Sequence, residues 1–196
     1  VHRLPVYAVN AFRRVVAQGA TTQDYLFAVF RQDRFHYIPA ASAVFVAAGA
    51  VASGTGAITP ALPSGIATGD ILLLYLETAN EAISIANPSS GTWTEVTNSP
   101  QGTGTAGSTG ATRLTVFWSR YNGTQGAPIT SDSGNHQIGR ITAYRGTVAS
   151  GDPWDVTAGG VSATSSTSAS IPGATTTVAN TLVVAAIATD LPSTTG

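Results

Sequence analysis

The chain has 196 residues, of which 10% are charged and 43% are apolar, and its formal net charge is -1. An average soluble protein has about 25% charged residues, so a domain built from helices with charged outer faces is disfavoured, and the apolar content is too high for a disordered chain. Cysteine and lysine are absent, which excludes disulfides, cysteine-bound metal sites, a lysine-dependent phosphate loop and Schiff-base chemistry. The near-neutral charge gives nucleic-acid binding little support.

Residues 1–40 form a basic, aromatic N-terminal arm, with five of the nine arginines and seven of the twelve tyrosines and phenylalanines. Such an arm either anchors a chain to a larger assembly or packs on its own domain, and both interpretations stay open. Its apolar positions between Ala8 and Val16 fit a helical face, whereas the aromatics in Tyr25–Phe30 and Phe35–Ile38 slightly favour a hairpin. No signal peptide is predicted, because Arg13 and Arg14 interrupt its apolar core.

Residues 41–196 carry the pattern of an all-β domain, because short apolar runs alternate with clusters of Gly, Pro, Asn and Ser. The longest apolar run in this part is too short to span a membrane. Eight short strands predict an antiparallel β-sandwich, of the jelly-roll or Ig-like kind. The predicted strands are Ala43–Ala52, Asp70–Glu77, Ala82–Ala86, Thr92–Thr97, Thr112–Tyr121, His136–Arg145, Ser166–Ile171 and Thr181–Thr189.

Two of these strands are apolar at both alternating positions, Ile71–Leu76 and Leu182–Ile187, which predicts central strands covered on both faces or at a subunit contact. In the strand Thr112–Tyr121, the residues Leu114, Val116 and Trp118 share one face, which we expect to be the core face, with Phe117 pointing outward. In His136–Arg145, Ile138 and Ile141 fall on opposite faces unless a bulge at Gly139 intervenes.

Few residues suggest chemistry. The segment Gly102–Gly107 matches the dinucleotide-binding pattern G-x-G-x-x-G, but no helix follows it, so a loop is the better interpretation. His136 lies four positions after Asp132, yet no Gly-x-Ser-x-Gly elbow occurs, and the residues between them are typical of a turn. We therefore predict no enzyme activity, no cofactor and no metal. Hydrolysis through His136 is kept as a third hypothesis.

The tryptophans offer a weak ligand-binding signal. Trp93 and Trp154 border predicted turns, where indole rings can stack on sugars, whereas Trp118 is expected in the core. A carbohydrate-binding β-sandwich that uses Trp93 and Trp154 is therefore the alternative function.

Several phrases resemble a group of virion structural proteins of tailed bacteriophages, described as tail-fibre, minor tail or capsid-associated proteins. They lie within residues 43–190 and do not cover the arm. The phrases are Gly69–Leu74, Gly91–Thr94, Leu114–Arg120, Gly134–Ile138, Gly151–Val156 and Asn180–Val184.

The resemblance implies a non-enzymatic β-sandwich carried on a virion, assembled in the host cytoplasm, with other virion proteins and further copies of itself as partners. We expect the arm or the central strands to dock on those subunits. The loops 98–110 and 122–134 would face solvent or the host surface, where a glycan is a candidate ligand. Further strands often follow in such proteins, so the resemblance also implies a sandwich cut short at residue 196.

Overall fold

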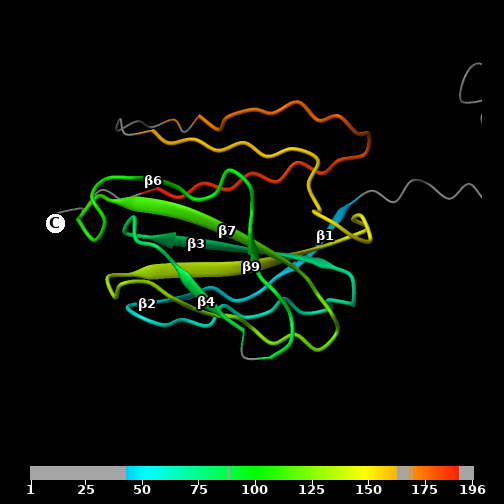
Figure 1. The fold of residues 1–196 in the computed structure, drawn as a ribbon, viewed down its shortest axis with the longest axis horizontal. Coiled ribbons are helices and arrows are strands. Elements are labelled where there is room, and N and C mark those ends of the chain that lie inside the picture. Colours follow the sequence, from blue (N-terminus) through cyan, green and yellow to red (C-terminus); the bar gives the residue numbers. More distant parts are fainter. Residues whose placement is uncertain (1–42, 88, 163–167, 169, 190–196) are drawn as a thin grey trace, which may run out of the picture. The chain divides into compact units, whose positions relative to one another are not determined.

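The computed structural model describes residues 43–87, 89–162, 168 and 170–189, and these residues contain strands, turns and irregular segments but no helix. The predicted arm, with its helix or hairpin, and half of the predicted strand Ser166–Ile171 lie outside the described residues. The described residues form the strands β1 (Val44–Ala48), β2 (Ala52–Gly54), β3 (Ile71–Thr78), β4 (Ser84–Ala86), β5 (Thr94–Glu95), β6 (Gln101–Thr103), β7 (Thr112–Arg120), β8 (Ile129–Ser131) and β9 (Gln137–Arg145) (Figure 1).

The strands form two antiparallel sheets, which confirms the predicted all-β class. The larger sheet has the order β1-β9-β3-β7-β5, with β2 paired to β9 and β6 paired to β7, and the smaller sheet joins β4 to β8. β3 pairs along its whole length with β7 on one side and β9 on the other. The apolar run Ile71–Leu76 is thus a central strand, as its pattern predicts.

The core lies between one face of the larger sheet and the residues that cover it. Leu72, Leu74 and Leu76 of β3 are completely buried on this face. They pack in one apolar cluster with the neighbouring strands and with covering residues that include a member of β4. The cluster contains Phe117, Ile141 and Ala143 from β7 and β9, and Ile58, Trp93, Ile83 and Ile85 from the covering side.

The side-chain faces of β7 are the reverse of those expected from the sequence. Phe117 is 7% exposed and belongs to the core cluster, whereas Leu114, Val116 and Trp118 are half-buried on the opposite face. The core face of β7 also carries the polar residues Thr115 and Ser119, one on each side of Phe117. One of them, Ser119, is satisfied because its hydroxyl donates to Gln125 Oε1 at 3.1 Å. Small polar residues therefore occupy core positions that the hydrophobic pattern assigns to larger side chains.

β9 follows its sequence pattern. Its register with β3 runs from Tyr144 to Gln137 without a shift, so no bulge occurs at Gly139. Ile141 is completely buried and Ile138 is exposed, which confirms that the two lie on opposite faces.

The predicted strand Ala43–Ala52 corresponds to β1 and to the first residue of β2, and both strands pair with β9. Gly49 lies in the break, where its N–H donates to the Ile141 carbonyl at 2.8 Å. A Cβ atom at Gly49 would lie 1.9 Å from the Ala61 carbonyl oxygen. The chain can therefore pass this point only without a side chain.

Gly49→Ala is expected to lower the free energy of unfolding by about 1–3 kcal/mol, because backbone atoms must move to admit the methyl group. Gly173→Ala is the matched control, since no atom lies within 4 Å of its added Cβ. Urea denaturation of both variants measures the difference. Equal stability of the two variants would contradict the close approach.

Three further expectations need correction. β6 and β8 lie within segments 98–110 and 122–134, which were expected to be loops, and β8 contributes a strand to the smaller sheet. The predicted central strand Thr181–Thr189 forms no strand, and Val183 is 81% exposed. This stretch has the composition of a buried strand but lacks a paired neighbour within the described residues.

Candidate functional site

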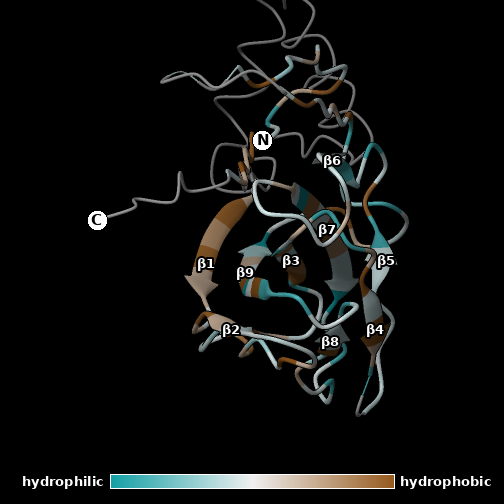
Figure 2. Ribbon diagram, turned by 90° about the vertical axis from the view of Figure 1, so that its left-hand side faces the viewer, coloured by the Kyte–Doolittle hydropathy of each residue, from teal (hydrophilic) through white to brown (hydrophobic). Residues whose placement is uncertain are grey.

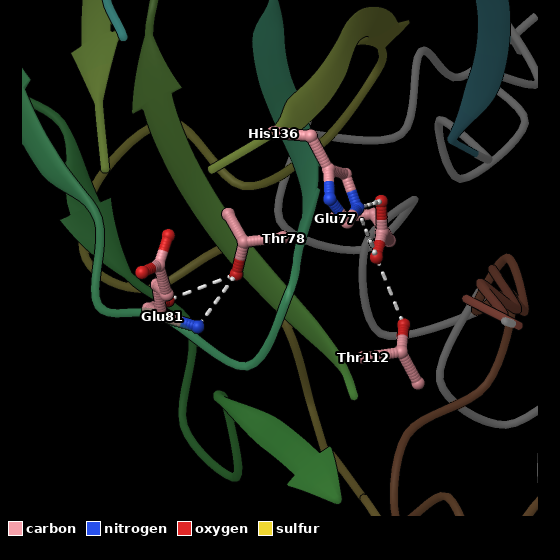
Figure 3. A network of polar contacts seen from close by, with 5 residues as sticks. All are labelled: Glu77, Thr78, Glu81, Thr112 and His136. Carbon is pink, nitrogen blue, oxygen red and sulfur yellow. Dashed lines mark hydrogen bonds and ion pairs between the residues drawn. The ribbon is translucent and has the colours of Figure 1, made fainter. Parts of the chain in front are cut away.

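The one imidazole in the described part of the chain meets a carboxylate at the end of the larger sheet (Figure 3). His136 directly precedes β9, and its Nε2 lies 3.2 Å from Oε2 of Glu77 near the end of β3. Thr112, the first residue of β7, donates its hydroxyl to Oε1 of Glu77 at 3.0 Å. The antiparallel register places the start of β7 and of β9 beside the end of β3, which explains why these three residues meet.

Glu81 lies close in sequence but makes a separate contact. Thr78 Oγ1 accepts from the Glu81 N–H at 3.1 Å and donates to the Glu81 carbonyl at 2.9 Å, which closes the turn after β3. Figure 3 shows this turn apart from the His136–Glu77 pair. The Glu81 backbone therefore shapes the sheet end, and its carboxylate forms no contact with His136.

The geometry around His136 does not match a nucleophile–base–acid triad. Asp132 Oδ1 accepts from the Gly134 N–H at 2.9 Å, as expected for a turn, and within the described residues the imidazole of His136 pairs with Glu77 instead of Asp132. The nearby hydroxyl of Thr112 donates to Glu77 rather than to the imidazole. No group of three or more metal-ligating side chains occurs within the described residues. His136 and Glu77 thus form an imidazole–carboxylate contact in which the His136 side chain is 49% exposed and the Glu77 side chain is 19% exposed.

The two tryptophans predicted to contact a ligand lie in different environments. Trp93 is 7% exposed and packs in the core cluster, which leaves no open ring face for a sugar. Trp154 is half-buried and meets Trp118 edge-to-face, with ring centroids 5.5 Å apart. Trp154 therefore covers the outer face of β7, and the structure does not join Trp93 and Trp154 into one binding surface.

A shallow cavity of about 390 Å³ lies at the other end of β3, beside two arginines. Arg145 forms a two-pronged ion pair with Asp70, with Nε–Oδ1 at 2.8 Å and Nη2–Oδ2 at 2.7 Å. The Arg145 guanidinium, through these hydrogen bonds, holds the pKa of the Asp70 carboxyl below its ordinary value. Arg120 donates to the carbonyls of Val148 and Gly151. Both guanidinium groups therefore hold the chain around the cavity, which gives them a structural role.

The glycine-rich segment 102–107 contains the last two residues of β6 and the start of the connection to β7. Asn80 donates its amide to the Gly104 carbonyl, and Asn135 donates its amide to the Gly107 carbonyl, each at 2.6 Å. Gly104 and Gly107 have φ angles of +85° and +75°, which favour glycine. No helix N-terminus follows in the described chain, so the segment lacks the phosphate-binding context of a dinucleotide site.

Comparison with protein-family models, with curated proteins and with solved structures gives no match for this chain. No helix within the described ranges is long and apolar enough to cross a membrane.

Proposed function

We propose that the chain is a structural component of a tailed-bacteriophage virion that docks on other virion subunits and displays an antiparallel β-sandwich of the jelly-roll or Ig-like kind. The proposal extends the resemblance in the sequence phrases. It is supported by a two-sheet scaffold whose apolar cluster joins the larger sheet to the residues over one face.

The observation that carries the proposal is a pair of uncharged stretches that bear exposed apolar side chains. No Asp, Glu, Lys or Arg occurs in residues 35–69 or 156–189. Within these stretches Phe45 is 57% exposed and Val183 is 81% exposed. Exposed apolar residues that lie close together mark contact surfaces in soluble proteins. A protein that functions by docking needs such surfaces.

A second part of the proposal concerns host attachment. The turn before β7 and the turn before β9 are joined, because Asn135 donates to Gly107 and the Gly107 N–H donates to the Ala79 carbonyl at 2.8 Å. Asn135 and neighbouring residues of both turns are exposed. These turns replace the longer loops 98–110 and 122–134 as the host-facing surface in this proposal.

The proposal is tested by peptide mass spectrometry of gradient-purified phage particles from the host that produces the chain. We expect peptides of the chain to co-purify with infectious particles at a fixed ratio to the major capsid protein, and to stay bound after a high-salt wash, because apolar contacts are not screened. The washed supernatant serves as the control. Recovery of the chain only from the supernatant would contradict a virion role.

A further inference from the structure

The segment Leu182–Ile187 has the composition of a strand but no strand partner among the described residues. It is apolar at both alternating positions, and its exposed members include Val183, Val184 and Ile187. Burial of a single Val, Leu or Ile side chain contributes about 1.5–3 kcal/mol. The unpaired arrangement therefore leaves a large favourable contribution unused.

Protection against strand pairing is also missing there. Soluble proteins guard exposed strands with charged residues, prolines or short strand lengths. Residues 173–189 contain neither a charged residue nor a proline. The segment can therefore accept or donate a backbone ladder without electrostatic or steric obstruction.

A matching acceptor lies at one edge of the larger sheet. β1 ends the strand order, β9 is its only strand partner in the described part of the chain, and it carries no charge. It is coloured hydrophobic along its length in Figure 2, and Val44 and Phe45 are both at least half exposed. The opposite edge consists of β5 and β6, which have two and three residues. Such short strands protect an edge, whereas β1 has five residues.

We propose that Leu182–Ile187 of one copy adds as a β-strand to the free edge of β1 in a second copy. The two segments have nearly the same length, neither carries a charge that would repel the other, and they are not paired within one described molecule. A donor segment on one surface and an acceptor edge on another make the contact heterologous. Repetition of this contact produces a ring or an open chain of subunits.

The inference adds a self-assembly contact to the proposed function but does not rest on it, because the contact requires no other virion protein. Failure to find the chain in particles would leave the strand addition standing. Failure of the strand addition would leave docking on other virion proteins standing.

Engineered cysteines provide the direct test, because the chain has no cysteine of its own. Copies with Phe45→Cys are mixed with copies that carry a single cysteine at Leu182, Val183, Val184 or Ala185. These four positions place two cysteines on each face of the donor strand. Neighbouring strands bring Cα atoms within the range that a disulfide spans. We expect at least one mixture to form a mixed disulfide dimer several-fold more efficiently than the control mixture with Val178→Cys.

The outcomes separate the pairing modes. Cross-linking no stronger than that of the Val178→Cys control in all four mixtures would overturn the proposal. Donor copies that cross-link efficiently to one another, without Phe45→Cys, would also overturn it, because that result indicates a symmetric pairing of two Leu182–Ile187 segments.

Sedimentation velocity of the unsubstituted full chain gives a second readout. We expect species larger than a monomer whose proportion rises with protein concentration. Val183→Pro is expected to abolish them, because proline removes a ladder donor, whereas Val178→Pro retains them. A far-ultraviolet dichroism spectrum equal to the parent's shows that each variant is folded. A parent chain that stays monomeric at all concentrations would overturn the proposal.

Discussion

Replacement of Phe117 by alanine is expected to lower the free energy of unfolding by about 3–5 kcal/mol, the largest effect of any single change considered. Phe117 is 7% exposed and packs in the cluster that joins the larger sheet to its covering residues. Its β3 neighbour in the ladder is Leu74, which is completely buried. Truncation of Phe117 would therefore leave a cavity at the centre of the core, measurable by urea denaturation.

Trp118→Ala is the matched comparison, because Trp118 is larger but lies on the opposite face of the same strand. It is half-buried and has an edge-to-face contact with Trp154. Loss of such an aromatic contact costs about 0.5–1.5 kcal/mol, beyond the partial loss of buried area. We expect Trp118→Ala to be less destabilising than Phe117→Ala. The reverse order would restore the face assignment derived from the hydrophobic pattern and contradict the structure.

Asp70→Asn is expected to lower the free energy of unfolding at neutral pH by about 1–3 kcal/mol, the range for loss of charge-assisted hydrogen bonds. The carboxylate is buried, binds Arg145 in two places and accepts the Ala67 N–H at 2.8 Å. Because the Arg145 side chain is 48% exposed, water can solvate it after the change, and the loss falls toward the lower end. Exposed Asp152→Asn is the control.

The same pair makes stability depend on pH. The pKa of Asp70 is lowered in the folded protein, mainly by the Arg145 hydrogen bonds, whereas in the unfolded chain it is about 3.9. Its contribution is therefore complete above the unfolded pKa and is lost as pH falls through the folded pKa. Denaturation from pH 7 to pH 2 should show a steeper acid loss in the parent than in Asp70→Asn. Parallel curves would contradict an ionised, paired Asp70.

The long strands were predictable from the sequence because their apolar runs are bounded by turn residues. The predicted β3, β7 and β9 differ from the structure by one residue at their ends. β6 and β8 were not predicted, because Gln101–Thr103 and Ile129–Ser131 are short and mostly polar. Their strand form depends on pairing with β7 and β4, which no local pattern records.

The assignment of side chains to faces was predictable only where one face is clearly polar. Both faces of β7 carry apolar residues, so size alone favours Leu114, Val116 and Trp118 as core residues. The structure instead satisfies the polar Ser119 through Gln125, which lies six residues later on the chain. The Ser119–Gln125 contact makes a polar residue compatible with the buried face, and alternation of hydrophobicity does not show this.

The candidate site was less predictable than the strands. His136 and Glu77 are 59 residues apart in sequence and meet only because β3 and β9 pair in one register. The tryptophans were selected because they border turns, but a turn position does not distinguish buried Trp93 from half-buried Trp154. Trp93 is buried because it packs in a cluster with residues of β3, β7 and β9, which are distant from it in sequence.

An image reconstruction of the intact particle tests the central claim, that this scaffold functions by contact between subunits. The account predicts density that fits the two antiparallel sheets, with the stretches around Phe45 and Val183 against neighbouring subunits and the turns at Gly107 and Asn135 facing outward. A reconstruction in which both apolar stretches face solvent, or in which the sheets fit no density, would contradict it.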